Sequence, residues 1–385
     1  MAHKTGIEEY YITKNNKRLQ FGYTTGTCAA AATKASAVLL LTRKIPEYVG
    51  IDTPKGIHLN LEPVNPVLGG DFASCGIIKD AGDDPDITNG ILVVSRVSLA
   101  DEGIEIDGGI GVGRVTKKGL EQPVGNAAIN SVPRSMIRKS LVEIAERYNY
   151  QGGFKVEISV PDGEETAKKT FNPRLGIVGG ISILGTSGIV EPMSEQALIS
   201  SLEVEIKQQI EVGNKNLVIT LGNYGSSYLG NLNLDDSVKC SNYIGEAIDL
   251  AVNHGAKGIL FVAHIGKFVK VAGGIMNTHS RNADCRAEIM SACALRAGAS
   301  RDVAMRILDT VTTDDSIEIL KNEGLLEDTM KIVCDKIAFY LNHRCMGNIR
   351  TEALIFSNAH GYLGETSGFS DYLEEIVADR KEQKE

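Results

Sequence analysis

The pattern of apolar and polar positions changes near residue 172, and this change predicts two domains. Before it, residues 154–160 alternate between apolar and polar side chains as a half-buried strand does, and residues 133–148 carry apolar side chains at helical spacing. An alanine-rich helix is predicted to start near Thr27 and to end near Leu41. Residues 1–172 are therefore expected to form an α+β domain.

After residue 172 short, unbroken apolar runs alternate with segments of helical periodicity. The runs have the length of strands that are covered on both faces, and they span residues 177–184, 217–221, 259–263 and 352–356. Helices are predicted between them at residues 194–212, 242–253 and 327–342. Such alternation predicts βαβ units, so residues 173–385 are expected to form a three-layer, Rossmann-like α/β domain with a mainly parallel sheet.

Glycine-bearing loops follow the first two of these runs, and His264 follows the third. The carboxyl ends of parallel strands meet at one edge of a sheet, where the ligands of open α/β sheets bind. The loops therefore predict a crevice that holds a nucleoside-like cofactor. The predicted cofactor-binding residues are Gly185, Thr186, Ser187, Gly188, Gly222, Asn223, Tyr224 and Gly225.

The stretch 264–288 concentrates the candidate chemistry. It carries His264 at a predicted strand end, His279 and Asp284, which are the catalytic candidates because imidazole and carboxylate groups transfer protons. Positive charge is supplied by Lys267, Lys270 and Arg281. The alternative for His264 is a core histidine that is bonded to a backbone carbonyl.

A helix capped by Thr278 or Ser280 is predicted within the same stretch. Four of its residues would share one face because they lie three, four and seven positions apart, namely Arg281, Asp284, Cys285 and Glu288. This face would bring two carboxylates and a guanidinium toward one loop. The alternative is a solvated helix face with weak ion pairs.

Three hydroxyl side chains stand at the start of the alanine-rich helix, on Thr24, Thr25 and Thr27. Together with the free amide groups of a first helical turn they make a candidate anion site. The alternative is a well-capped helix that is packed tightly in the core. A glycine-rich loop at residues 108–113, followed by Arg114 and Lys117, also suits an anionic ligand, although it lacks the spacing of a dinucleotide-binding loop.

Composition narrows the classes of function. The 385 residues have a formal net charge of -9, which argues against a general nucleic-acid surface because phosphate binding needs a clustered basic face. Seven cysteines without a CxxC pair weaken a zinc reading and fit a reducing cytosol. The acidic residues 80–86 lack the spacing of a calcium loop and are interpreted as a solvated loop. Without a secretory signal or a membrane-length apolar run, a cytoplasmic protein with no membrane partner is expected.

Three motifs together resemble the CbiD family. They are GYTTGTCAAAATKA at residues 22–35, GTSGIVEPMS at 185–194, and HIGKFVKVAGG with THSRNAD at 264–274 and 278–284. The segment VTKKGLEQPVGNAAINSVPR at 115–134 is similar too. The resemblance covers nearly the whole chain and implies an enzyme of anaerobic cobalamin biosynthesis that methylates C-1 of cobalt-precorrin-5B to give cobalt-precorrin-6A. It implies S-adenosylmethionine as methyl donor, with cobalt present only in the substrate.

A corrinoid substrate of this kind carries several carboxylate side chains, so the cations become candidate clamps. The predicted substrate-binding residues are Thr24, Thr25, Thr27, Arg114, Lys117, Lys267, Lys270, Ser280 and Arg281. Two alternatives remain open at this point, a non-catalytic corrinoid carrier and a kinase-like enzyme that binds phosphate at the threonine-rich helix start. The sequence leaves open whether the chain forms a homo-oligomer.

Overall fold

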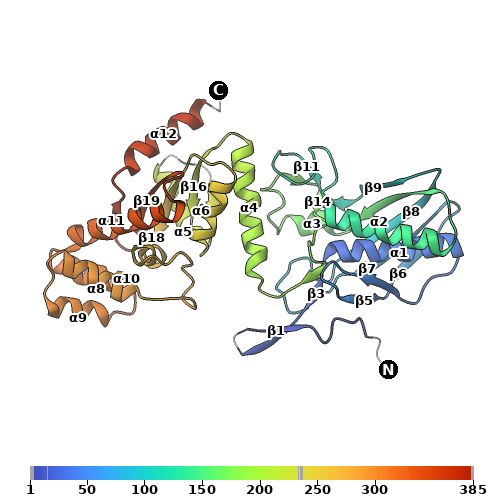
Figure 1. Cartoon of the computed structure of the whole chain (residues 1–385), viewed down its shortest axis with the longest axis horizontal. Coiled ribbons are helices and arrows are strands. Elements are labelled where there is room, and N and C mark those ends of the chain that lie inside the picture. Colours follow the sequence, from blue (N-terminus) through green and yellow to red (C-terminus); the bar gives the residue numbers. More distant parts are fainter. Residues whose placement is uncertain (1–3, 15, 233, 235–236, 383–385) are drawn as a thin grey trace. The chain divides into compact units, whose positions relative to one another are not determined.

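The chain folds into two compact units, Met1–Glu195 and Gln196–Glu385, which are called unit 1 and unit 2 below (Figure 1). The computed structural model describes residues 4–14, 16–232, 234 and 237–382. Unit 1 extends past residue 172, where the sequence pattern placed the domain boundary. Among the described residues no helix is long and apolar enough to cross a membrane.

Unit 1 is built on a five-stranded sheet. In spatial order the strands are β6 (Val64–Leu68), β7 (Phe72–Ile78), β8 (Leu92–Ala100), β12 (Gly153–Ser159) and β9 (Ile104–Gly108). Neighbouring strands run antiparallel except β12 and β9, which are parallel. The helix α1 (Thr25–Thr42) packs on β7 and β8, and α2 (Ser131–Arg147) lies beside α1 (Figure 1). The helix and strand predicted at residues 133–148 and 154–160 are thereby confirmed.

Small side chains explain why α1 lies in the middle of unit 1. The residues Cys28 to Ala32 have no exposed surface, and α1 touches the sheet on one side and α2 on another. A helix that is apolar all round is buried all round. Alanine keeps the backbones close because it has no side chain beyond Cβ.

Short paired strands complete unit 1. The antiparallel pairs are β1 (Tyr11–Lys14) with β2 (Lys17–Gln20), β3 (Gly22–Tyr23) with β15 (Ile189–Val190), β4 (Val49–Asp52) with β5 (His58–Leu61), and β11 (Arg114–Val115) with β13 (Ile177–Val178). The pair β10 (Gly111–Val112) and β14 (Gly180–Ile181) is parallel, and α3 (Gly163–Ala167) is a short helix.

The apolar run 177–184 was predicted to be the first strand of the C-terminal sheet, and that prediction is wrong. The run is split into β13 and β14, which pair with strands of unit 1. Gly179 takes a φ of +83°, which interrupts the run. Gly180 then lies so close to the neighbouring strand that a Cβ atom would stand 2.1 Å from the carbonyl oxygen of Gly111.

Unit 2 contains a five-stranded sheet that is mainly parallel, as predicted. Its spatial order is β17 (Val238–Lys239), β16 (Asn216–Thr220), β18 (Gly258–His264), β19 (Arg350–Ser357) and β20 (Gly361–Glu365). The first four strands are parallel and β20 is antiparallel to β19. The predicted strands 217–221, 259–263 and 352–356 are confirmed, whereas β17 and β20 were not predicted.

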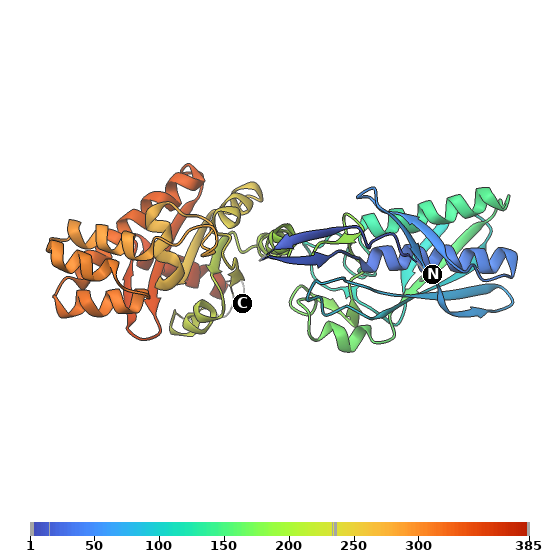
Figure 2. The same cartoon turned by 90° about the horizontal axis from the view of Figure 1, so that it is seen from below.

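Helices cover both faces of this sheet. One face shares its hydrophobic core with a layer of helices, which are α4 (Glu195–Glu211), α6 (Ile244–Asn253), α7 (Ile265–Phe268), the 3-10 turn η2 (Val269–Gly273), α8 (Arg286–Arg296), α9 (Arg301–Leu308), α10 (Thr313–Asn322) and α11 (Leu326–Cys345). The other face packs against η1 (Leu229–Leu232), which follows α5 (Asn223–Tyr228), and α12 (Phe369–Glu382). Figure 2 shows α8, α9 and α10 gathered at one end of the unit. Leu260 and Val262 face α12 while Phe261 faces the larger helical layer, so successive strand residues serve the two cores.

Candidate active site

The strand order of unit 2 creates a switch point between β16 and β18. The chain leaves β16 into α5 on one face of the sheet and leaves β18 into α7 on the other face. In open α/β sheets the ligand crevice lies at such a point, outside the carboxyl ends of the strands. Gly222 follows β16 and His264 ends β18, and the rings of Tyr224 and His264 stand 5.6 Å apart across this edge.

In the loop after β16, glycine is needed at two positions for two different structural reasons. Gly222 takes a φ of +153° at the start of α5, and a Cβ atom there would meet open space. Gly225 is buried, and a Cβ atom there would stand 2.7 Å from the carbonyl oxygen of Val262. Tyr224 is exposed, and Asn223 accepts a hydrogen bond from Lys239. The open side of the loop is therefore formed by Gly222, Asn223 and Tyr224, while Gly225 lets α5 approach the sheet.

His264 is half-buried and its ring faces two backbone donors. The amide of Gly266 points at Nδ1 over 3.1 Å and the amide of Asn358 points at Nε2 over 3.3 Å. A protonated imidazole carries a hydrogen on both nitrogens and so cannot accept from either amide. Burial of the ring lowers the pKa of His264, and the negative charge of Asp314 opposes this shift only in part. His264 is therefore kept neutral, and its one unprotonated nitrogen accepts a hydrogen bond from one of the two amides, whereas the alternative foresaw a backbone carbonyl as its partner.

A polar cleft of about 350 Å³ lies beside His264 in unit 2. It joins the loop after β17, the start of α7 and the segment before α8. Its lining residues are Asn242, Gly266, Lys267, Lys270, Thr278, His279, Ser280 and Arg286. Four of the predicted site residues, Lys267, Lys270, His279 and Ser280, are thus brought together in one place. The cleft contains no lining carboxylate within the part of the chain that the structure describes.

Lys270 organises the wall of this cleft. Its side chain is only 3% exposed, and Nζ donates to the carbonyl oxygens of Thr278 at 3.2 Å and Ala283 at 2.8 Å. Burial lowers the pKa of Lys270, while the carboxylate of Asp284 at 3.9 Å opposes that shift. Because the ammonium group is engaged with the protein backbone, Lys270 shapes the segment 278–283.

Asp284 does not lie on a helix with Arg281, which corrects the predicted face. The helix α8 begins at Arg286, and Cys285 before it has a φ of +55°. Asp284 instead accepts two hydrogen bonds from Arg286, at 2.6 Å and 2.9 Å. The hydrogen bond from Arg286 lowers the pKa of Asp284, so the carboxylate is a weak proton acceptor. With these two hydrogen bonds, the carboxylate of Asp284 orients the guanidinium of Arg286.

The segment between Thr278 and Arg286 is a turn, held by contacts within the segment and with Asn242. The amide of Arg281 donates to Nδ1 of His279 over 3.1 Å, and the amide of Thr278 donates to the carbonyl of Asn242 over 3.0 Å. Arg281 is exposed and is not among the cleft-lining residues. The predicted cap residues Thr278 and Ser280 thus stand in the turn that forms one wall of the cleft.

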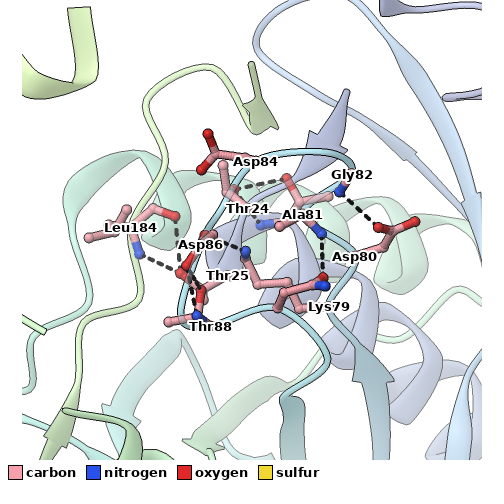
Figure 3. Close-up of polar contacts among 12 residues, drawn as sticks. Thr24, Thr25, Lys79, Asp80, Ala81, Gly82, Asp84, Asp86, Thr88 and Leu184 are labelled. Atoms are coloured by element: carbon pink, nitrogen blue, oxygen red, sulfur yellow. Dashed lines mark hydrogen bonds and ion pairs between the residues drawn. The ribbon is translucent and has the colours of Figure 1, made fainter. Parts of the chain in front are cut away.

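The threonines at the start of α1 are satisfied within unit 1 (Figure 3). Thr24 caps the helix by accepting from the amide of Thr27, and the amide of Gly26 donates to the carbonyl of Leu184. Thr25 exchanges hydrogen bonds with Leu184, and Thr27 donates to the carbonyl of Gly188 over 2.6 Å. The amides of Gly26 and Thr27 are therefore not free, and the well-capped, packed helix is the arrangement observed.

The loop 185–188 is part of this same packing. Gly185 has a φ of +133°, and a Cβ atom there would stand 2.3 Å from Oγ1 of Thr24. Ser187 turns its hydroxyl onto the carbonyl of Ile189, and Thr186 is exposed. This loop belongs to unit 1, whereas the loop 222–225 belongs to unit 2. They are therefore not neighbouring strand ends of one sheet, which corrects that prediction.

Arg114 and Lys117 are also engaged within unit 1. Arg114 forms a two-pronged pair with Asp107, at 2.7 Å and 2.9 Å, and donates to the carbonyl of Gly108. Lys117 donates to the carbonyl of Arg174 over 3.1 Å. The glycine-rich loop before them serves close backbone packing, since a Cβ atom at Gly111 would stand 1.8 Å from the carbonyl oxygen of Val160. Both side chains belong to unit 1, whereas the cleft is formed by residues of unit 2.

The acidic residues 80–86 form a bonded loop and not simply a solvated one. Asp86 pairs with the buried Lys79 over 2.6 Å, as Figure 3 shows, and Asp84 accepts from the amide of Met193. Across the described ranges no group of three or more histidine, cysteine or acidic side chains is arranged to hold a metal ion. The acidic loop thus fastens neighbouring segments of unit 1.

Several cleft residues were not singled out from the sequence. Asn242 follows β17, whose two residues give no strand signal, and Arg286 lies just beyond the predicted catalytic residues. The amide of Asn358, just after β19, donates toward Nε2 of His264, and the negative charge of Asp314 on α10 acts on the pKa of His264. Arg286 could have been identified from the sequence, because it is a basic residue two positions after the predicted catalytic residue Asp284. The contacts of Asn358 and Asp314 depend on tertiary structure.

The parallel sheet, its switch point and the cleft with its cationic lining define an α/β protein with a candidate ligand site in unit 2. Family comparison makes this specific, and the chain belongs to the CbiD family. The family model described as CbiD matches residues 12–192, and the model described as the CbiD C-terminal domain matches residues 277–367.

Relatives match over nearly the full chain. A cobalt-precorrin-5B C(1)-methyltransferase from Ruminiclostridium cellulolyticum is 51% identical, with 96% of this chain and 98% of the relative covered. One from Photorhabdus laumondii is 40% identical, with 94% and 97% covered. The crystal structure of the cobalamin biosynthesis protein cbiD from Archaeoglobus fulgidus is 31% identical, with a TM-score of 0.39, and the match covers 70% of this chain and 86% of that one.

Proposed function

We propose that this protein transfers a methyl group from S-adenosylmethionine to C-1 of cobalt-precorrin-5B, giving cobalt-precorrin-6A. The observation that carries the proposal is the match to cobalt-precorrin-5B C(1)-methyltransferases at 40–51% identity over more than nine tenths of the chain. The cationic cleft of unit 2 supports it, because a corrinoid with several carboxylates needs positive partners. All seven cysteines are free thiols, which suits a reducing cytoplasm.

Unit 2 is proposed as a Rossmann-like cofactor unit. Its switch point offers an open glycine at Gly222, the amide of Asn223 and the exposed ring of Tyr224, which would hold a nucleoside. S-adenosylmethionine supplies a methyl group that is already activated by the positive sulfur. His264 borders the crevice as a neutral ring, so it adds no positive charge beside a sulfonium ion.

In this reaction the main task of the protein is to align the two reactants. The ring carbon attacks the methyl group, the carbon–sulfur bond breaks, and its electron pair stays on sulfur. Holding nucleophile, methyl group and sulfur in line is worth several kcal/mol in reactions of this type. We propose that the cleft fixes the corrinoid by a carboxylate beside the crevice at the switch point. Cobalt enters as part of the substrate.

The test is an anaerobic assay of purified protein with methyl-labelled S-adenosylmethionine and cobalt-precorrin-5B, followed by mass spectrometry. The expected product carries one additional labelled methyl group at C-1. Corrinoid that is retained without methylation would indicate the carrier alternative. Binding of a magnesium nucleotide without corrinoid binding would indicate the kinase-like alternative.

The environment of His264 predicts the pH dependence of this reaction. Because burial lowers the pKa of His264, the ring stays neutral as the pH falls through the ordinary histidine value of about 6.5. The rate of methyl transfer is therefore expected to stay level from about pH 8 to pH 6.5. A pH profile of kcat checks this. An acid limb centred near 6.5 that disappears in His264→Asn would contradict the inferred neutral state.

A further inference from the structure

Hydrogen-bond donors line the cleft of unit 2. For His279, the structure indicates which ring nitrogen carries the hydrogen. Its Nδ1 accepts from the amide of Arg281 over 3.1 Å, so Nδ1 carries no hydrogen in this arrangement. A neutral imidazole with an unprotonated Nδ1 has its hydrogen on Nε2. His279 therefore offers an N–H group and not a proton acceptor at its outer nitrogen. This tautomer suits an anion better than it suits the proton transfer predicted for His279.

Arg286 is held in one orientation by Asp284. The carboxylate takes the edge of the guanidinium formed by Nε and Nη2, at 2.6 Å and 2.9 Å. The Nη1 group makes no hydrogen bond with any residue that the structure describes, and Arg286 lines the cleft. A guanidinium has five N–H groups, so Nη1 retains donors in a plane that Asp284 has fixed.

The remaining cations have different positions. The ammonium group of Lys270 donates hydrogen bonds to two backbone carbonyls. Lys267 is exposed at the rim of the cleft and adds to its positive charge. Asp284 binds the edge of Arg286 formed by Nε and Nη2 and is not among the residues that line the cleft. An anion that enters thus meets Nη1 of Arg286 and Nε2–H of His279, with no carboxylate in its way.

We propose that Arg286, positioned by Asp284, binds one side-chain carboxylate of the corrinoid in this cleft and selects the free acid over its neutral amide. This inference rests on the proposed function for the identity of the ligand. A cleft of about 350 Å³ is at the small end of the range of roughly 300–1,000 Å³ for ligand pockets, so it admits a side chain and excludes the macrocycle. Discrimination follows because a carboxylate offers only acceptor oxygens to the donors of Arg286 and His279, whereas a neutral amide carries no charge and turns an NH₂ donor toward one of them.

The experiment compares Arg286→Gln, Arg286→Lys and Asp284→Asn, with Arg296→Gln as control. Arg296 is an exposed arginine at the far end of the same helix, so its loss removes the same charge outside the cleft. Binding of cobalt-precorrin-5B is measured from its visible absorbance, and kcat and KM are measured for each substrate. Circular dichroism establishes that each variant is folded.

Arg286→Gln is expected to weaken corrinoid binding about 10- to 100-fold, as the loss of a charged hydrogen bond does, while KM for S-adenosylmethionine is unchanged. Arg286→Lys should recover part of the affinity, because an ammonium keeps the charge but not the planar fork. Asp284→Asn should raise KM for the corrinoid, and the double variant with Arg286→Gln should be no worse than Arg286→Gln alone. A purely structural Asp284 would add its own loss in the double variant.

Three results would overturn the inference. One is a rise in KM for S-adenosylmethionine with corrinoid binding unchanged, which would assign the carboxylate to the methyl donor. The second is equal binding of the corrinoid and its side-chain amide by the wild type, and the third is an equal loss in Arg296→Gln. Because binding is read without turnover, a wild type that binds the corrinoid through Arg286 but transfers no methyl group refutes the proposed activity and leaves the subsite standing.

Discussion

Asp86→Ala is expected to destabilise unit 1 by about 3–5 kcal/mol, as the removal of one partner from a buried ion pair does. Lys79 is 2% exposed and its Nζ lies 2.6 Å from a carboxylate oxygen of Asp86. Asp86 also accepts from the amide and hydroxyl of Thr88, each at 2.7 Å. Without the carboxylate, the Lys79 ammonium is buried with no countercharge and the 79–91 loop loses its fastening.

Hydrogen exchange with mass spectrometry along a urea series is the suitable measurement, since the chain has no tryptophan and peptides report on unit 1 separately. Asp71→Ala is the matched control, because Asp71 is an exposed aspartate in the same unit and should change stability by less than about 0.5 kcal/mol. The double variant Lys79→Met with Asp86→Ala should recover much of the loss. If it is as unstable as Asp86→Ala, the buried charge is not the cause.

The ion pair of Lys79 and Asp86 also predicts how a fall in pH affects the stability of unit 1. Burial works to raise the pKa of Asp86, but the charge and hydrogen bond of Lys79 outweigh it, so the pKa lies below the ordinary value. A depressed pKa means that the folded state binds fewer protons than the unfolded state as the pH falls. The stabilisation is complete above the unfolded value of about 3.9 and is lost as the pH falls through the folded value.

The sequence predicts the centre of unit 2 because its signals there are local. The unbroken apolar run before His264 can only be satisfied between two helical layers, and a strand so placed ends at the ligand-binding edge. The loop at Gly222 is predicted at the same edge because it also follows a buried strand. The gathering of Lys267, His279 and Ser280 in one cleft depends on their closeness in the chain to that strand end.

The errors arise where distant contacts override a local signal. Thr278 and Ser280 are good cap residues, yet α8 begins at Arg286 because Lys270 binds the carbonyls of Thr278 and Ala283 and holds that segment as a turn. The run 177–184 has strand composition, but Gly179 interrupts it with a φ of +83°, and Gly180 fits against the backbone of Gly111 in unit 1. In unit 1, the threonines at the start of α1 contact the loop 185–188, and composition alone cannot separate such packing from ligand binding.

Gly185→Ala is expected to destabilise unit 1 by about 3 kcal/mol, from overpacking against Thr24 and a strained backbone. A Cβ atom there would stand 2.3–2.5 Å from three side-chain atoms of Thr24, whose hydroxyl caps α1. The control Gly179→Ala has a φ of +83° and no atom within 4 Å of the new Cβ, so it should cost only the backbone strain of about 1–2 kcal/mol.

The assignment of residue 185 to packing or to the cofactor is decided by comparing stability with KM. If Gly185 is a packing residue, Gly185→Ala lowers the urea midpoint of unit 1 while folded enzyme keeps its KM for S-adenosylmethionine. If the loop 185–188 binds the cofactor as first predicted from the sequence, KM rises at temperatures where the variant is fully folded. The contact with Thr24 favours packing, because the space that a ligand would need beside Gly185 is filled by that side chain.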